Sequence, residues 1–331
     1  MVLGFAIATR LIIPANVRLT RPLSHTTTCS ARRERRSENV PGNVFVDSSC
    51  IDCDICRWVA PETFGRFNAK SAVHTQPESE HDKLKALQAM VSCPTGSIRT
   101  ATPEPLAKQA ASSFPIPARD RSQQEVPDIY FNGYSSENTF GASSWLALSK
   151  HAAVIFDCPR YSENLAKNIE KLVGDRKLYL VLSHRDDVYG HAKWAERLDC
   201  SRIIHAAECN SSQRTNECEI KLRDSQFPYN LDDDFVIFHV PGHSKGSICL
   251  LHKSSRSLFS GDHIAFSSKV NELMAFRRYN SYSWDAQIES IAMLADINFK
   301  YIWPGHGRKV EFIHEHERRE QIEALTERMR S

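Results

Sequence analysis

Four cysteines in the N-terminal third of the chain constrain its folding more than any other feature. Cys50, Cys53 and Cys56 follow one another at three-residue intervals, and Cys93 stands directly before Pro94. Three thiolates on one tight loop can occupy three corners of an iron–sulfur cubane, while the fourth corner needs a cysteine from elsewhere. Because no cysteine closely follows Cys56, we expect Cys93 to supply that corner and the chain to hold one cluster rather than two.

The segment before Cys93 has the pattern of a helix. Its apolar residues Leu84, Leu87, Met90 and Val91 recur at helical spacing, which would press the helix onto the cysteine loop. A cysteine in the middle position of the loop favours four irons over three. A structural zinc site is the alternative interpretation of four cysteines.

The cysteines lie within a stretch of wider similarity. VFVDSSCIDCDICRWVAPETF, with VSCPTGSI downstream, resembles a single-cluster bacterial-type ferredoxin over residues 42–103. The resemblance implies one [4Fe-4S] cluster held by Cys50, Cys53, Cys56 and Cys93. It also implies an electron donor and the cluster-assembly machinery as partners.

Residues 1–36 differ in composition from the rest of the chain. No Asp or Glu occurs before Glu34, whereas the segment holds seven arginines and several serines and threonines. Such an Arg-rich, hydroxylated and acid-poor start is typical of an organelle transit peptide; a disordered basic tail is the other interpretation. Without these seven Arg and one Glu, the formal net charge of +2 becomes about −4, which argues against nonspecific binding to nucleic acid. No apolar run has the length needed to cross a bilayer, so we expect no membrane span.

Prolines mark the next segment, residues 104–127, which lacks the apolar periodicity of a core and is interpreted as a semi-rigid linker. A second domain is expected over residues 128–331, where short apolar runs alternate with helical patterns. Polar residues stand at the ends of its predicted strands: His184 after LYLVL, His243 after FVIFHV, Asp262 after SLFSG and His306 after YIWPG. Strand-end loops that meet at one rim are how a sheet assembles a metal site from distant parts of a sequence.

These strand-end segments also carry a resemblance. LSHRDDVYGH, HVPGHSKGSICLL, LFSGDH and IWPGHG resemble the metallo-β-lactamase fold superfamily over residues 128–312. The resemblance implies an α+β protein in which a ferredoxin-like domain is followed by an αβ/βα sandwich of two mixed sheets. It implies a site for one or two zinc, iron or manganese ions. The combination of both domains, including HRDDV, FRRYN and WPGHGR, also resembles a group of plant and algal plastid proteins, which favours the chloroplast over the mitochondrion.

The first motif departs from the family's His-x-His-x-Asp-His signature. Asp186 stands where the second histidine belongs, and no Asp directly precedes His191. His184, His243 and Asp262 remain as the expected catalytic set, and two imidazoles with one carboxylate suit non-haem Fe(II). Asp186 would shift the preference further from zinc toward iron or manganese. A second ion would need additional ligands, and the candidate metal ligands are therefore His184, Asp186, Asp187, His191, His243, Asp262 and His306.

Three functions fit these ligands. We predict a hydrolase in which the metal site activates water to attack a carbonyl of a small-molecule substrate, as in the thioester-cleaving glyoxalase II branch, with Asp262 bridging the ions. An oxidoreductase resembling persulfide dioxygenases, whose cluster supplies or senses electrons, is the first alternative. A non-catalytic iron–sulfur protein that keeps only the fold is the second.

Overall fold

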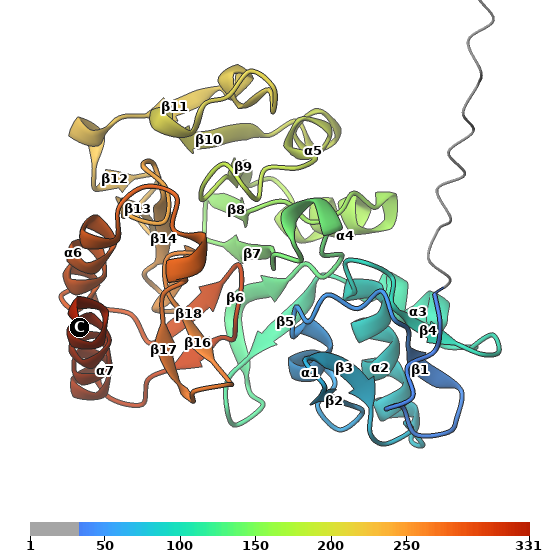
Figure 1. Ribbon diagram of the computed structural model, residues 1–331. Coiled ribbons are helices and arrows are strands. Elements are labelled where there is room, and N and C mark those ends of the chain that lie inside the picture. Colours follow the sequence, from blue (N-terminus) through green and yellow to red (C-terminus); the bar gives the residue numbers. More distant parts are fainter. Residues whose placement is uncertain (1–32) are drawn as a thin grey trace, which may run out of the picture. The chain divides into compact units, whose positions relative to one another are not determined.

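Two mixed β-sheets packed face to face form the larger part of the structure (Figure 1). The computed structural model describes residues 33–331, and residues 1–32, which make up most of the predicted transit peptide, lie outside the described residues. The seven-stranded sheet has the order β11 (Ile220–Leu222), β10 (Ser201–His205), β9 (Lys177–Val181), β8 (Ala152–Phe156), β7 (Trp145–Leu148), β6 (Glu125–Phe131) and β5 (Ile116–Arg119). The six-stranded sheet has the order β12 (Tyr229–Asn230), β13 (Phe235–His239), β14 (Ile248–His252), β15 (Ser257–Gly261), β18 (Tyr301–Pro304) and β19 (Val310–Glu311).

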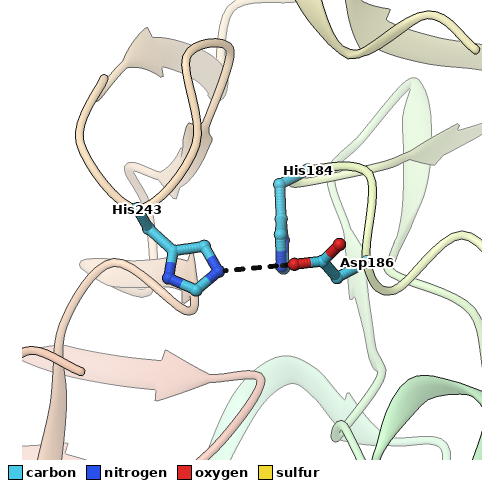
Figure 2. Close-up of side chains that lie close together, drawn as sticks. All are labelled: His184, Asp186 and His243. Carbon is cyan, nitrogen blue, oxygen red and sulfur yellow. Dashed lines mark ion pairs between the residues drawn. The ribbon is translucent and has the colours of Figure 1, made fainter. Parts of the chain in front are cut away.

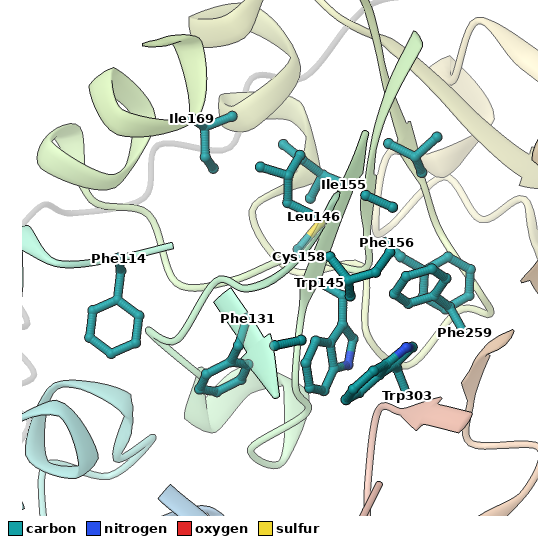
Figure 3. Packing of buried hydrophobic residues seen from close by; sticks show 14 of the residues in the cluster. Phe114, Phe131, Trp145, Leu146, Ile155, Phe156, Cys158, Ile169, Phe259 and Trp303 are labelled. Atoms are coloured by element: carbon teal, nitrogen blue, oxygen red, sulfur yellow. The ribbon is translucent and has the colours of Figure 1, made fainter. Parts of the chain in front are cut away.

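Alternation along the strands explains why both faces of the six-stranded sheet are buried. In β13, Phe235 and Ile237 belong to the cluster between the sheets, whereas Val236 belongs to the cluster on the other face. Successive side chains of a strand point to opposite faces, so an unbroken apolar run supplies two cores at once. Between the sheets, the ring centroids of Phe156 and Phe259 lie 5.8 Å apart. Figure 3 shows these two side chains next to each other.

Helices cover the outer faces of the two sheets. Trp194 of α5 and Leu165 of α4 pack into the core on the side of the seven-stranded sheet, while α6 and α7 pack against the outer cluster of the six-stranded sheet. Ser162 caps α4, because its hydroxyl accepts a hydrogen bond from the backbone of Leu165, and Gly174 follows the last turn, as the sequence predicts. These helices are α4 (Glu163–Val173), α5 (His191–Leu198), α6 (Trp284–Leu294) and α7 (Glu315–Arg330). The predicted αβ/βα sandwich is therefore confirmed.

A smaller N-terminal region precedes the sandwich. Its strands form two pairs, β1 (Val44–Val46) with β4 (Ile98–Thr100) and β2 (Phe64–Phe67) with β3 (Lys70–Val73). Its helices are α1 (Ile55–Val59) and α2 (Glu80–Ser92), and α2 confirms the helix predicted before Cys93. The backbone of Arg35 forms an isolated antiparallel β-bridge with that of Asp47, so the last residues of the predicted transit peptide belong to this region.

The predicted linker over residues 104–127 is wrong. This segment forms α3 (Ala107–Ser112) and β5, and it begins β6, so it contributes two strands to the seven-stranded sheet. Proline is compatible with these strands because β5 lies at the edge of the sheet, and because Pro127 lies outside the stretch of β6 that pairs with β7. The sandwich therefore begins before residue 128.

The remaining elements are short. The strands β16 (Ala265–Ser267) and β17 (Glu272–Met274) form a hairpin, and the 3-10 helices are η1 (Glu137–Thr139), η2 (Ala206–Glu208), η3 (Thr215–Glu217), η4 (Asp224–Gln226) and η5 (Arg277–Tyr279). Among the described residues, no helix has both the length and the apolar character that crossing a membrane requires.

Candidate metal centre

The four polar residues predicted at strand ends meet at one edge of the sandwich. His184 lies three residues after β9, His243 follows β13 through a Pro-Gly turn, Asp262 directly follows β15, and His306 lies two residues after β18. The loop that carries His243 is held in place by Ser281. The carbonyl of His243 accepts hydrogen bonds from the backbone N–H and from the hydroxyl of Ser281, both at 2.7 Å. The sequence therefore identified the edge of the sheet at which these side chains converge.

Two imidazoles and two carboxylates surround a common point. His184 Nε2 lies 3.7 Å from one oxygen of Asp262 and 3.7 Å from one oxygen of Asp186, and the corresponding distances from His243 Nε2 are both 3.8 Å. Figure 2 shows His243 facing Asp186 beside His184. Ligand atoms about 2.1 Å from a tetrahedral ion stand about 3.4 Å apart, so this spacing is close to that of a metal-binding set.

Unpaired buried atoms show that these residues fit a metal ion. His184 Nε2, His243 Nε2, His306 Nε2 and both carboxylate oxygens of Asp187 are buried and have no hydrogen-bond partner among the described residues. Leaving such groups unpaired in a protein interior costs about 1–3 kcal/mol each. One or two cations that accept lone pairs from imidazoles and carboxylates would satisfy these atoms.

Asp187, Asp262 and His306 form the second part of the centre. His306 Nδ1 lies 2.7 Å from Asp262 Oδ1, and Asp187 is brought near Asp262 and His184. Gly305 permits this approach, because a Cβ at that position would stand 3.0 Å from Asp262 Oδ1 and 3.4 Å from Asp187 Oδ2. Asp262 thus lies between two groups of donors, as the sequence predicted for a bridging carboxylate.

Burial and neighbouring charges set the protonation of the centre. Burial lowers the pKa of His184, which keeps its imidazole neutral and its lone pair available to a metal ion. Burial raises the pKa of Asp187 well above its usual range, so this carboxyl stays protonated until a cation approaches. Burial lowers the pKa of His306, but the carboxylate of Asp262 outweighs that effect and raises it to about 10.

Two supporting residues were missed by the sequence analysis. Ser183 Oγ lies 2.8 Å from His184 Nδ1, which orients the ring so that Nε2 faces the centre. Asp157 in turn accepts a hydrogen bond of 2.8 Å from the backbone of Ser183. Asp157 directly follows β8, so the strand-end rule that found the other residues would also have found it.

His191 is not a ligand in this arrangement, and its prediction as one is wrong. It begins α5, where its Nδ1 lies 3.2 Å from Arg202 Nη1 and its Nε2 lies 2.9 Å from the carbonyl of Gln213. Both ring nitrogens are therefore engaged by groups outside the centre. Asp187, and not His191, reaches the second group of donors.

The four predicted cysteines meet in the N-terminal region, where Cys50, Cys53, Cys56 and Cys93 line one small cavity. Burial raises the pKa of Cys56 to about 12 and that of Cys53 well above its usual range, so these thiols need bound iron to become thiolates. Hydrogen bonds already point at the sulfurs, because the backbone of Ser97 donates to Cys93 Sγ at 3.3 Å. The donor set and its shared cavity fit an iron–sulfur cluster.

The cysteine loop contacts the loop that carries His306. Arg308 donates to both carboxylate oxygens of Asp54, at 2.7 and 3.1 Å, and Asp54 follows Cys53 directly. Gly141 also lies against the cysteine loop, since a Cβ there would stand 3.1 Å from the Cβ of Cys53. The two candidate metal sites are therefore connected by direct contacts within the described part of the chain.

Comparison with known proteins supports both halves of this description. Residues 46–100 match the 4Fe-4S single cluster domain of ferredoxin I. The hydroxyacylglutathione hydrolase of Pelagibacter ubique (strain HTCC1062) is 30% identical over 124 residues, which are 35% of this chain and 50% of that protein. The acyl-coenzyme A thioesterase MBLAC2 of Bos taurus is 33% identical over 76 residues, which are 23% of this chain and 26% of that protein. The chain thus spans half or less of the length of these relatives.

Solved structures of metallo-β-lactamases are also similar, at low identity. DIM-1 metallo-β-lactamase exposed to ceftazidime is 19% identical with a TM-score of 0.48, and the match covers 63% of this chain and 98% of that one. FIM-1 from Pseudomonas aeruginosa in its mono-zinc form is 17% identical with a TM-score of 0.45, and the match covers 60% of this chain and 90% of that one.

Proposed function

We propose that this protein is a metal-dependent hydrolase that cleaves small-molecule thioesters, joined to a domain that holds one [4Fe-4S] cluster. The observation that carries the proposal is the convergence of unpaired buried donors from His184, His243, His306 and Asp187 around Asp262. The thioester class is supported by the two similar hydrolases, whose names refer to a glutathione thiol ester and an acyl-coenzyme A. The part of the proposal that concerns the cluster rests on the four cysteines and on the match to the ferredoxin domain.

Each residue of the centre has a separate task in this proposal. His184 and His243 would hold a metal ion through their Nε2 atoms, and Asp262 and Asp186 would each place one negative charge beside it. Asp262 also lies toward His306. A bound ion supplies Lewis acidity and lowers the pKa of water. Asp187 has no hydrogen-bond partner among the described residues, so it is free to bind a second cation.

The centre is open to solvent on the side of Asp186. The side chain of Asp186 is 44% exposed, whereas those of His184 and His243 are almost fully buried. Tyr189, on the same loop, is 56% exposed. An exposed carboxylate can be displaced by a substrate oxygen more easily than the buried ligands, so we place the entry of the substrate beside Asp186.

The test is thioester hydrolysis by the full chain, purified without oxygen and loaded with zinc. A panel of hydroxyacyl-glutathione and acyl-coenzyme A esters is followed by release of the free thiol. We expect turnover that His243→Ala lowers at least 100-fold, together with loss of bound zinc, because one of two imidazole ligands is removed. The matched control is His151→Ala, an exposed histidine in the turn between β7 and β8. Thiol release no faster than in the metal-free protein would reject the hydrolase.

A second candidate function is an oxidoreductase that oxidises a persulfide with dioxygen. It is favoured by the contacts of Asp54 with Arg308 and of Cys53 with Gly141, which bring a redox cluster against the loop of the second centre. The oxygen-rich ligand set also suits iron or manganese better than zinc. Iron in the second centre and oxygen uptake on glutathione persulfide, without thioesterase activity, would favour this function over the hydrolase.

We propose further that residues 1–36 direct the protein to an organelle, with the chloroplast favoured over the mitochondrion. The support is the composition of this segment, which has seven arginines and a single acidic residue. An electron donor and the cluster-assembly machinery are proposed as partners there. Import of the labelled full chain into isolated chloroplasts tests the location, and import into mitochondria alone would correct it.

A further inference from the structure

The two imidazoles of the metal centre are carried by loops from different sheets. His184 lies in the loop after β9 of the seven-stranded sheet, and His243 lies in the loop after β13 of the six-stranded sheet. Their ring centroids are 4.8 Å apart, and Figure 2 shows both rings beside Asp186. Ligands bind a metal ion well only when they are held within about 0.5 Å of the required geometry. The two loops therefore have to be fixed relative to each other.

Glu208 is a buried carboxylate that lies between these two loops. It is the last residue of η2, which follows β10, and its side chain is fully buried. A buried carboxylate costs free energy unless it is paired and hydrogen-bonded, so its partners show what the group is held for. None of the roles assigned above involves this residue.

The carboxylate of Glu208 holds the loop of His184. Its Oε2 accepts hydrogen bonds from the backbone N–H of Arg185 at 3.1 Å and from Arg185 Nε at 2.7 Å. Arg185 Nη2 donates to Glu208 Oε1 at 3.3 Å and to the carbonyl of Ala207 at 3.0 Å. Arg185 stands between His184 and Asp186 in the chain. The residue between two of the proposed ligands is thus fixed by its main chain and by its side chain.

The same carboxylate also holds the loop of His243. Glu208 Oε1 accepts a hydrogen bond of 2.6 Å from the backbone N–H of Gly246, three residues after His243. This close approach requires glycine, because a Cβ at Gly246 would stand 2.8 Å from Glu208 Cγ and 2.5 Å from His205 Nδ1. Any larger residue would push the loop away from Glu208.

The contacts of Glu208 can be lost without separating the two sheets. All its partners are N–H groups, so both oxygens accept and the group acts as an ionised carboxylate, neutralised by Arg185. A backbone hydrogen bond of 2.9 Å from Ile248 to the carbonyl of Ser183 joins the same two sheets without Glu208. A change at Glu208 is therefore expected to shift the loops more than the fold.

We propose that Glu208 is a positioning residue of the metal centre, which fixes the loops of His184 and His243 at the separation at which both imidazoles bind one ion. It acts through Arg185 and Gly246 and touches neither the ion nor the substrate. The inference rests on the proposed function, because it needs an ion at His184 and His243, but it does not depend on which substrate is cleaved.

The test compares Glu208→Gln with the matched control Glu219→Gln. Glutamine keeps the size of the side chain but replaces one acceptor oxygen by an NH2 group, which cannot accept from the facing N–H groups. Glu219 accepts the same kind of contacts from Arg202, namely from the backbone N–H at 2.6 Å and from Nε at 3.0 Å. None of its hydrogen bonds among the described residues reaches the loop of His184 or that of His243. A purely structural effect would lower the melting temperature of both variants and leave metal binding unchanged.

Zinc affinity is measured by competition with a chromophoric chelator on the full chain with its cluster intact. We expect Glu208→Gln to bind zinc about tenfold more weakly or worse, and Glu219→Gln to bind it as the wild type does. Cobalt(II) in place of zinc gives a second readout, because its EPR spectrum reports ligand geometry while an oxidised [4Fe-4S] cluster is silent. The cobalt spectrum should change in Glu208→Gln and stay the same in Glu219→Gln.

Arg185→Met replaces Glu208→Gln if that variant does not fold. It removes the guanidinium but keeps the backbone contacts of residues 185 and 246 with Glu208, so we expect about a three- to tenfold loss of zinc affinity. Equal zinc affinities and equal cobalt spectra in Glu208→Gln and Glu219→Gln would overturn the inference, as would an Arg185→Met variant that binds zinc like the wild type.

The proposed hydrolase is judged by a separate measurement, the release of thiol by the wild type. If the wild type binds zinc but releases no thiol, the thioesterase is rejected, and the zinc affinities still decide the role of Glu208. A wild type that binds no zinc would overturn both.

Discussion

Replacing Ser183 by alanine tests how the centre positions its first imidazole. The Ser183 hydroxyl lies 2.8 Å from His184 Nδ1, and both residues are almost fully buried. When Nδ1–H donates to this hydroxyl, Nε2 keeps its lone pair and faces Asp262 and Asp186. The change removes the acceptor and leaves Nδ1 unpaired, while the hydrogen bond from the backbone of Ser183 to Asp157 remains.

The expected effect of Ser183→Ala follows from that single contact. An unpaired buried polar group costs about 1–3 kcal/mol, and each 1.4 kcal/mol corresponds to a factor of ten in affinity. We therefore expect metal affinity at the second centre to fall about 10- to 100-fold, which is the usual range for losing a partner of a ligating histidine. Zinc affinity is measured by competition with a chromophoric chelator on protein that retains its cluster.

The matched control is Ser149→Ala. Ser149 is also buried, and its hydroxyl bonds to the carbonyl of Ala152 and to Asp232, at the opposite end of β8 from Asp157. This variant should lose stability but keep its metal affinity. A zinc affinity of Ser183→Ala within threefold of the wild type would refute the orienting role of the hydroxyl.

Three further changes test other parts of the structure. Cys53→Ser should abolish the visible absorption of the cluster, and an unchanged spectrum would reject a [4Fe-4S] site at these cysteines. Gly305→Ala places a methyl group 3.0 Å from Asp262 Oδ1, so titration with zinc should show affinity about tenfold lower or worse, with unchanged absorption of the cluster. His191→Ala should lower the free energy of unfolding by about 1–3 kcal/mol in denaturant titrations because Arg202 and the Gln213 carbonyl lose a partner, yet metal content should not change. Loss of metal from that variant would restore His191 as a ligand.

The sheet and its edge could be predicted because their signals are local. An apolar run such as FVIFH is buried on both faces, so it stands out from the polar residues that end it, and His243 and Asp262 fall directly after such runs. Spacing also predicted the cysteine loop and the helix that brings Cys93 to it. In each case the residues that decide the structure are close together in sequence.

The errors arose where tertiary context decides. Prolines at 115, 117 and 127 suggested a linker, but the sheet tolerates them where they stand. Pro117 lies in the edge strand β5, whose outer N–H groups need no partner, and Pro127 lies outside the part of β6 that pairs with β7. The spacing of His191 from His184 suggested that it is a metal ligand, but at the start of α5 its side chain contacts Arg202 instead.

The central claim is that His184, His243 and Asp262, with their neighbours, hold a metal ion separate from the iron–sulfur cluster. The most direct measurement is the metal and sulfide content of the full chain, purified without oxygen and then dialysed against zinc. We predict about four irons and four sulfides per chain for the cluster, plus one or two further ions that are lost in a His184→Ala, His243→Ala double variant with an unchanged cluster spectrum. Iron and sulfide in equal amounts, with no further ion bound by the wild type even after dialysis against zinc, would contradict the claim.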